Sequence, residues 1–330
     1  MKAAKASPTA PPETLTFGAT QVSITHPDRV LFPADGITKA ELVHYYRDVA
    51  RFMLPYVEHR PLTLQRFPEG IDGFSFFEKK APKGLPDWVA TTEQPRADGA
   101  GKVNYPMAND ARALAWFANL ASIAFHVWIS RVESIRSPDY LLFDLDPFEG
   151  CTVRTLAEVA IGLRDELHAV GLETVVKTTG GKGLHVLAPL APGYSYEDGR
   201  AMNEIVAHRM RARLPAAVTL ERTKAKRAEG TVYFDWAQLG LGRTMVAPFS
   251  VRPRPSAPVS TPITWSEVEA MTSDRSKHPT AVTFARWNLK NVPPLLAQAG
   301  DQWKGRMKHG QALEPALEQA RAKWSGRAEA

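Results

Sequence analysis

The order of the predicted elements in the middle of the chain constrains the fold more than any other feature. Apolar runs, β-branched runs and capping residues predict, in order, a strand at residues 140–146, a helix at 152–171, strands at 172–177 and 184–188, a helix at 195–213 and a strand at 231–236. A further strand at 244–251 is expected to pair with the last of these. The order β-α-β-β-α-β is that of a ferredoxin-like sheet with two helices on one face. The opposite face of such a sheet is open to a ligand.

The flanking segments predict a second α/β unit and two tails. Thr38 and Glu41 form a capping box before helically spaced apolar residues, and Asp110 is expected to cap a helix running to about His126. Residues 60–90 alternate short apolar runs with Pro and Gly, which indicates strands and loops. We therefore expect an α+β fold, divided into a flexible tail at 1–20, an N-terminal α/β module at about 21–137, the sheet, or palm, at about 138–255, a helical extension at about 256–300, and a C-terminal helix or tail at 301–330 with the helix itself at 311–325.

Composition narrows the partners and the compartment. Among 330 residues, 41 are Lys or Arg and 35 are Asp or Glu, and the basic residues cluster, which favours a polyanionic partner. Cys151 is the single cysteine, so an intramolecular disulfide and a multi-cysteine metal site are excluded. The sequence has no secretory signal pattern and no run of about 18 apolar residues. We expect a cytoplasmic, nucleoid-associated protein with no membrane partner.

Two aspartates end the first strand of the palm. Side chains two residues apart on a strand project from the same face, so Asp144 and Asp146 face outward together while Phe143 and Leu145 face the core. Adjacent carboxylates repel each other, and a hard divalent cation relieves that repulsion. A solvated strand end or an Asx turn is the alternative. Because the Asp-x-Asp pattern also occurs in glycosyltransferases, it does not choose the substrate.

Asp235 supplies a third carboxylate on the last strand of the predicted sheet. In the β-α-β-β-α-β arrangement, this strand and the first one can both lie on the open face. Three carboxylates there can hold two divalent ions, one for an attacking 3′-hydroxyl and one for a triphosphate and its leaving pyrophosphate. Taken alone, Asp235 could equally be an exposed strand residue.

A glycine-rich turn at residues 177–185 joins the two middle strands. Glycines let backbone N–H groups approach phosphate oxygens, and Lys182 adds charge to the turn. The spacing of a Walker A loop is absent, and an ordinary Gly-rich hairpin is the alternative. The turn leads into a strand that should place His185 beside Asp144 and Asp146, where it could donate to a triphosphate.

The motifs in combination resemble a known family. They are Phe-Asp-Leu-Asp-Pro at 143–147, Thr-Gly-Gly-Lys-Gly-Leu-His at 179–185, Asp-Trp-x-Gln at 235–238, Ser-Val-Arg at 250–252, the run at 25–33 and Phe-Phe-Glu-Lys at 76–79. Their order and gaps resemble the polymerase domain of bacterial ligase D, of the archaeo-eukaryotic primase superfamily, over roughly residues 20–300. The resemblance implies a primase-polymerase fold, with an RRM-like palm packed on the N-terminal module as one catalytic domain at 21–300.

The resemblance also implies roles for individual residues. The metal ligands and catalytic carboxylates would be Asp144, Asp146 and Asp235, with two Mn²⁺ or Mg²⁺ ions. The nucleotide-binding residues would be Thr179, Lys182, His185, Arg252, His126 and Gln238, where His126 is placed at the end of a helix. The residues for the 5′-phosphate across a DNA gap would be His26, Arg29 and Lys39. The residues that stack on the template would be Phe76 and Phe77, of which at least one should be exposed because neighbours on a strand face opposite sides.

As implied by the resemblance, the activity is templated nucleotide addition at gapped or broken DNA ends in bacterial non-homologous end joining, with Ku and a DNA ligase as partners and ribonucleotides preferred over deoxyribonucleotides. Two other functions stay open. One is a metal-dependent enzyme on another phosphate substrate, such as a nucleotide cyclase or a DxD transferase. The other is a DNA-end-binding module without activity. The carboxylate triad argues against the module, and the DNA-end residues argue against a small-substrate enzyme.

Overall fold

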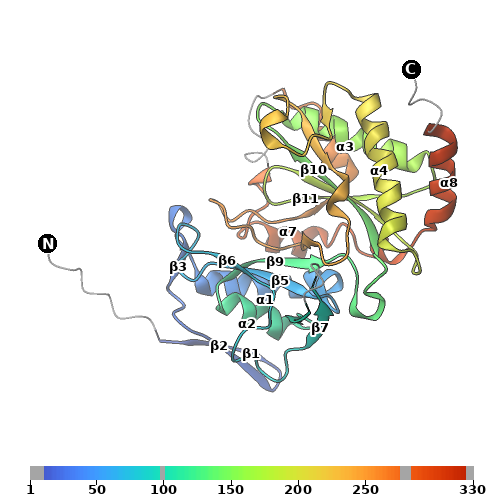
Figure 1. Ribbon diagram of the computed structural model, residues 1–330. Coiled ribbons are helices and arrows are strands. Elements are labelled where there is room, and N and C mark those ends of the chain that lie inside the picture. Colours follow the sequence, from blue (N-terminus) through green and yellow to red (C-terminus); the bar gives the residue numbers. More distant parts are fainter. Residues whose placement is uncertain (1–10, 97–100, 276–283, 325–330) are drawn as a thin grey trace.

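The computed structural model describes residues 11–96, 101–275 and 284–324 of the chain. It has two sheets with their helices, one built from the first part of the sequence and one from the middle (Figure 1). The C-terminal segments pack against both, with α7 (Val292–Ala299) contacting α1 and α8 (Leu313–Trp324) contacting α4. No helix in the described ranges has the length and apolar character that crossing a bilayer requires.

The palm is a six-stranded sheet with the order β13-β14-β10-β12-β11-β16. Its strands are β10 (Tyr140–Pro147), β11 (Val175–Thr178), β12 (Leu184–Pro189), β13 (Val218–Thr219), β14 (Val232–Asp235) and β16 (Pro262–Ile263). The four central strands, with α3 (Val153–His168) between β10 and β11 and α4 (Tyr196–Arg213) between β12 and β14, have the predicted ferredoxin-like order. The expected α+β palm is therefore confirmed, and β13 and β16 extend it at each edge.

The two palm helices begin where their capping residues predict. The Thr152 hydroxyl accepts a hydrogen bond from the N–H of Thr155, and Ser195 forms a reciprocal capping box with Asp198. Both helices cover the same face of the sheet (Figure 1). On that face, Leu141 lies 3.3 Å from the position that a Cβ on Gly199 of α4 would occupy. The even-numbered residues of β10 consequently project from the other face.

The N-terminal module is a four-stranded sheet with the order β15-β9-β5-β6 and two helices packed together. Its elements are β5 (Leu62–Arg66), β6 (Phe76–Glu78), β9 (Ser122–Trp128), β15 (Thr244–Val246), α1 (Lys39–Val57) and α2 (Ala111–Asn119). Helix α1 starts at the predicted capping box of Thr38 and Glu41. The buried Tyr46 hydroxyl donates to the carbonyl of Ile123, 2.6 Å away, and so fixes α1 against β9.

The remaining elements are short. They are the hairpins β1 (Glu13–Phe17) with β2 (Thr20–Ile24), β3 (Val30–Phe32) with β4 (Ile37–Thr38), and β7 (Thr91–Pro95) with β8 (Lys102–Pro106), and the helix α5 (Trp265–Met271). The predicted tail at 1–20 is wrong from residue 13 onward, because β1 pairs with β2 and buries Leu15; residues 1–10 lie outside the described ranges.

Two predictions, one for the module and one for the palm, were wrong. The helix capped by Asp110 ends at Asn119, and residues 122–128 form a strand, so His126 lies on β9 and not at the end of a helix. The chain turns between them at Ala121, whose φ is 57°. The expected strand at 244–251 is β15, which pairs with β9 in the module's sheet and not with β14. Because β9 is paired on both edges and buried on both faces, its apolar run has no period that separates strand from helix.

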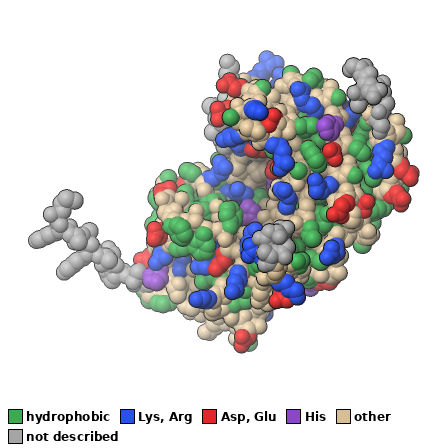
Figure 2. All heavy atoms as spheres, viewed as in Figure 1, with side chains coloured by type: hydrophobic (Ala, Val, Ile, Leu, Met, Phe, Trp, Pro, Cys, Tyr) green, Lys and Arg blue, Asp and Glu red, His purple; other side chains and the backbone are tan. Residues whose placement is uncertain are grey.

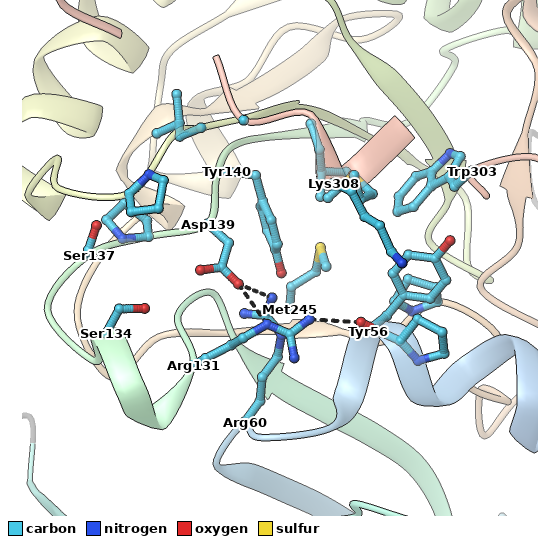
Figure 3. Close-up of a pocket in the computed structure, with 18 residues that line it drawn as sticks. Tyr56, Arg60, Arg131, Ser134, Ser137, Asp139, Tyr140, Met245, Trp303 and Lys308 are labelled. Carbon is cyan, nitrogen blue, oxygen red and sulfur yellow. Dashed lines mark hydrogen bonds and ion pairs between the residues drawn. The ribbon is translucent and has the colours of Figure 1, made fainter. Parts of the chain in front are cut away.

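A cavity of about 340 Å³ marks the junction between palm, module and C-terminal segment (Figure 3). Asp139, just before β10, makes ion pairs with Arg60 and Arg131 of the module. Tyr140 also lines this cavity, and it projects from the same sheet face as Asp144 at the opposite end of β10. The buried Leu142 lies between the two positions. The cavity is thus separate from the predicted carboxylate site.

Candidate active site

A row of polar side chains crosses the open face of the palm. Asp144 on β10 is directly opposite Asp235 on β14 and directly opposite His185 on β12, and His185 is opposite Lys177 on β11. Directly opposed residues of antiparallel strands project from the same face with Cβ atoms roughly 5 Å apart. Asp146 follows on the same face, two residues along β10. The fold therefore brings the three predicted carboxylates together, with a histidine and a lysine in line beside them.

The charges on this row perturb one another. Burial raises the pKa of Asp235, and the neighbouring charge of Asp144 raises it further. Burial also raises the pKa of Asp146, and Asp144 again adds to the increase against the effect of Lys182. For Asp144, burial is outweighed by the side chains that face it, His185 first and then Lys177 and Arg252, so its pKa is lowered. Two of the three carboxylates thus carry charge that is only partly compensated by the protein.

The donor set fits a hard divalent cation, which prefers carboxylate oxygens. In the described ranges no three His, Cys, Asp or Glu side chains converge as a ready-made metal site. The carboxylates face basic side chains: Asp144 Oδ1 lies 3.4 Å from His185 Nε2, and Asp146 lies 3.7 Å from both Lys182 Nζ and Arg227 Nη1. A metal ion bound at Asp146 would therefore be repelled by these two cations.

The predicted glycine turn is held tightly against the carboxylate strand. The Thr179 hydroxyl accepts hydrogen bonds from the N–H groups of Gly181 and Gly183, each at 3.2 Å. A Cβ on Gly183 would lie 2.3 Å from the carbonyl oxygen of Leu145, so only glycine fits there. The ammonium of Lys182 donates to the carbonyl of Pro147. The turn and the end of β10 therefore form one structural unit.

Four basic side chains gather in the interior beside Asp144. Lys177 is fully buried and donates from Nζ to the Ser260 hydroxyl at 2.6 Å, and His185 is opposite it on β12. His126 and Arg252 complete the group, since the charges of Arg252 and Lys177 both lower the pKa of His126. In the described part of the chain, His126 Nε2, His185 Nδ1 and Arg252 Nε are buried without a hydrogen-bond partner. Unpaired buried donors of this kind are costly, which is consistent with a polar ligand.

Burial and neighbouring positive charge explain the ionisation of this cluster. Burial lowers the pKa of His126 to about 3, with Arg252 as the next cause. Burial and then Lys177 lower the pKa of His185 to about 4. Burial and then Arg254 lower the pKa of Arg252 to about 10. Both histidines are therefore neutral at pH 7, and an anion entering here would favour protonation of the whole cluster.

The structure also identifies site residues that sequence reasoning missed. Lys177 stands in a run of β-branched residues on β11. A lysine inside such an apolar run is the signal by which the sequence could have identified it as a site residue. Arg227 belongs to the basic run at residues 222–227, which the sequence shows before β14; its guanidinium lies over the ring of Tyr233 at 3.6 Å and faces Asp146. Gln238, by contrast, donates to the carbonyl of Thr244 at 3.1 Å and so holds the loop between β14 and β15. Its predicted contact with a nucleotide stays a prediction.

The three residues predicted for the 5′-phosphate lie together at the start of α1. The N–H of Arg29 donates to the carbonyl of His26, and the N–H of Lys39 donates to the carbonyl of Arg29. His26 and Arg29 are exposed, whereas Lys39 is buried and donates to the Thr25 hydroxyl at 3.0 Å. Burial and then the charge of Arg29 lower the pKa of Lys39 to about 8. Two adjacent cations at a helix N-terminus suit an anion.

The predicted phenylalanine pair lies on β6, at the edge of the module's sheet. Phe77 is 58% exposed, as expected of one member of the pair, and its ring lies 5.6 Å from that of His126. Phe76 is half-buried and stacks on Phe74, which is 66% exposed and which sequence reasoning missed. Figure 2 shows that the molecule is hollowed between the palm and the module, with Lys and Arg side chains along the hollow.

The sequence and the fold both match known proteins. Residues 38–303 match the family model of the LigD primase-polymerase domain. The chain belongs to this family. The resemblance predicted from the motifs is therefore confirmed, and so is the primase-polymerase fold.

Several LigD proteins are similar to this chain. It is 37% identical over 250 residues to the multifunctional non-homologous end joining protein LigD of Mycolicibacterium smegmatis, covering 75% of this chain and 32% of that protein. It is 29% identical over 251 residues to the bifunctional non-homologous end joining protein LigD of Bacillus subtilis, covering 76% of this chain and 40% of that protein. The chain thus spans about a third of the mycobacterial LigD.

A solved LigD structure matches the fold. The polymerase domain of Mycobacterium tuberculosis ligase D in complex with DNA aligns with a TM-score of 0.78 and 33% sequence identity, covering 88% of this chain and 99% of that one. The similarity therefore extends over the palm and the module together. It makes this chain a LigD-type polymerase domain.

Proposed function

We propose that this LigD polymerase domain is a template-directed nucleotidyltransferase that fills gaps and extends DNA ends in bacterial non-homologous end joining. One observation carries the proposal: Asp235, Asp144, His185 and Lys177 form a single row across four strands. The row places carboxylates for cations next to buried donors for an anion. A nucleoside triphosphate with divalent metal has both kinds of charge.

Asp144, Asp146 and Asp235 would hold two ions, Mn²⁺ or Mg²⁺. When bound, the two ions supply activation of a 3′-hydroxyl and stabilise the triphosphate and the leaving pyrophosphate. The chain's own cations have a separate task. Lys177, His185 and Arg252 bind the triphosphate from the buried side, and Lys182 with the Thr179 turn binds it from the rim. These groups neutralise charge in a site from which water is excluded, where such contacts are strongest.

DNA would be bound at two further places. Arg29, Lys39 and His26 would take the 5′-phosphate on the far side of a gap, and Phe76 and Phe77 would stack on template bases. The names of the relatives, non-homologous end joining proteins, support broken DNA as the substrate. Ku and a DNA ligase as partners are proposed from the family resemblance. The preference for ribonucleotides is supported by the family resemblance alone.

The alternatives have less support. A nucleotide cyclase or a DxD transferase uses small substrates and has no need of exposed Phe74 and Phe77 or of a basic pair at α1. A DNA-end-binding module without activity has no need of three carboxylates on one sheet face, because their mutual repulsion is unfavourable in the absence of a cation.

Primer extension tests the proposal. The protein should add nucleotides to the 3′-end of a gapped, 5′-phosphorylated duplex with Mn²⁺, should follow the template base, and should use ribonucleotides with a higher kcat/KM than deoxyribonucleotides. Removal of the metal with a chelator should stop the reaction. If no nucleotide is added under Mn²⁺ with any triphosphate, the polymerase function is wrong. Release of pyrophosphate without DNA would favour the cyclase.

A second prediction concerns the 5′-phosphate. Arg29→Ala and Lys39→Ala should each erase the advantage of a 5′-phosphorylated gap, while extension of a primer-template without a downstream strand continues. Each lost contact should lower the log–log salt slope of binding by roughly 0.9. Because Lys39, with a pKa of about 8, is charged below that pH and neutral above it, the advantage should shrink as pH rises through 8. Arg321→Ala on α8 is the control, and an unchanged phosphate advantage in both variants would refute the assignment.

A further inference from the structure

A basic groove of about 510 Å³ lies beside the edge of the module's sheet, away from the carboxylate row. Its polar lining residues are Lys79, Lys80, Arg96, Lys102, Asn104 and Tyr105. Lys79, Lys80 and Lys102 are exposed, and none of the lining residues that the structure describes is acidic. Lys102 pairs with Glu93 outside the groove, at 2.9 Å, with both side chains well exposed. Such a concentration of cations in one hollow suits a polyanion.

The fold holds the walls of the basic groove in place. Lys79 and Lys80 directly follow β6, and the N–H of Ala81 donates to the carbonyl of Asn104 on β8 at 2.7 Å. The ring of Tyr105, also on β8, packs against Trp128 at 5.3 Å. The two walls are therefore joined by backbone and by core packing. The groove therefore has a fixed position relative to the module's sheet.

Two connections run from the basic groove to the active site. On one side, Phe77 precedes the groove on β6 and contacts His126 of the buried cluster. On the other side, Gly242 lines the groove, and the charge of its neighbour Arg243 lowers the pKa of Asp235. The loop that carries both follows the third carboxylate directly. A strand that leaves the carboxylate row can thus cross Phe77 and enter the groove.

We infer that Phe74, Phe77 and the basic groove hold the single-stranded template that has not yet been copied, ahead of the active site. This inference rests on the proposed function. Surfaces that bind single strands combine a cationic groove for the backbone with exposed aromatic rings for the bases. Inside a duplex the faces of the bases are stacked on each other, so successive bases can stack on such rings only in an unpaired strand. The exposed Phe74 and Phe77 therefore favour single strand over duplex.

The test measures binding, so it needs no catalysis. Fluorescence anisotropy is recorded for primer-templates whose unpaired 5′ template overhang is one, four or eight nucleotides long, over a series of salt concentrations. The unmodified protein should bind the longer overhangs more tightly. In a triple variant, Lys79→Ala, Lys80→Ala and Lys102→Ala, this gain should disappear. The log–log salt slope for the longest overhang should fall by about 2, at roughly 0.7 for each single-strand contact.

A matched control removes the same charge elsewhere. The control is the triple variant Arg154→Ala, Arg321→Ala and Lys323→Ala. The three residues lie on α3 and α8, on the helical side of the palm. This variant should leave the overhang dependence and nucleotide addition unchanged. Phe74→Ala with Phe77→Ala should weaken long-overhang binding and leave its salt slope unchanged, since stacking involves no charge. Equal losses in the groove and control variants would overturn the inference. So would a groove variant that weakens blunt duplex as much as an overhang. If extension fails but these differences hold, only the polymerase function is wrong.

Discussion

Replacing Asp144 with alanine is expected to abolish nucleotide addition. Asp144 is the centre of the polar row, opposite Asp235 on one side and His185 on the other. Its loss removes a ligand from any two-ion site and the partner that His185 faces at 3.4 Å. We expect a loss of at least ~10³-fold in single-turnover extension, which corresponds to about 4 kcal/mol of transition-state stabilisation.

A second variant, Asp144→Asn, distinguishes a loss of catalysis from a loss of folded structure. Asp144→Asn keeps the shape of the side chain and removes its charge, and it should lose activity almost as completely as Asp144→Ala. The groups that face Asp144, His185 first, lower its pKa, so the ionised carboxylate stabilises the fold and its loss should lower the midpoint of thermal unfolding modestly. A cooperative unfolding transition in Asp144→Asn would show that the lost activity does not come from an unfolded protein. Extension at near-normal rates by either variant would contradict the assignment of the carboxylate row.

Replacing Lys177 with methionine is expected to stabilise the protein and weaken nucleotide binding. Lys177 is fully buried, and its ammonium bonds only to the Ser260 hydroxyl and, at 3.5 Å, to the carbonyl of Thr178 among the described residues. A buried charge without a carboxylate partner is unfavourable, and methionine has a similar length without it. We expect the unfolding midpoint to rise by about 2 °C or more. A charge-assisted bond to phosphate is worth roughly 1.5–3 kcal/mol, so KM should rise about 10- to 100-fold.

The pH dependence gives this prediction an independent test. Burial lowers the pKa of Lys177 in the folded chain well below its ordinary value of 10.5. At a pH between the lowered pKa and the ordinary one, the unfolded chain binds a proton that the folded chain releases. Stability then rises with pH up to about the unfolded pKa of 10.4. The extra stability of Lys177→Met should accordingly be largest near neutral pH and should vanish as pH approaches that value. Lys177→Arg is the companion variant that keeps a cation. A methionine variant with lower stability and unchanged KM would refute this account.

Much of the palm could be predicted because its signals are local. Capping residues such as Thr152 and Ser195 act within one helical turn, and the alternation around Asp144 follows from strand geometry. The strand at 122–128 could not be predicted in this way. His126 follows a capped helix in a continuous apolar run, and only pairing with β5 and β15 makes that run a strand. Pairing with β9 also places residues 244–246 in the module's sheet and not in the palm sheet.

The sequence by itself determined the order of the palm elements, the shared face of Asp144 and Asp146, and the glycine turn, because each depends on neighbours along the chain. The tertiary structure alone decided which residues meet across strands. The register places Asp235 and His185 on either side of Asp144, and packing leaves Lys177 and Arg252 inside without a carboxylate in hydrogen-bond contact among the described residues. Register and burial depend on contacts between residues far apart in sequence, and a single sequence carries no local signal for them.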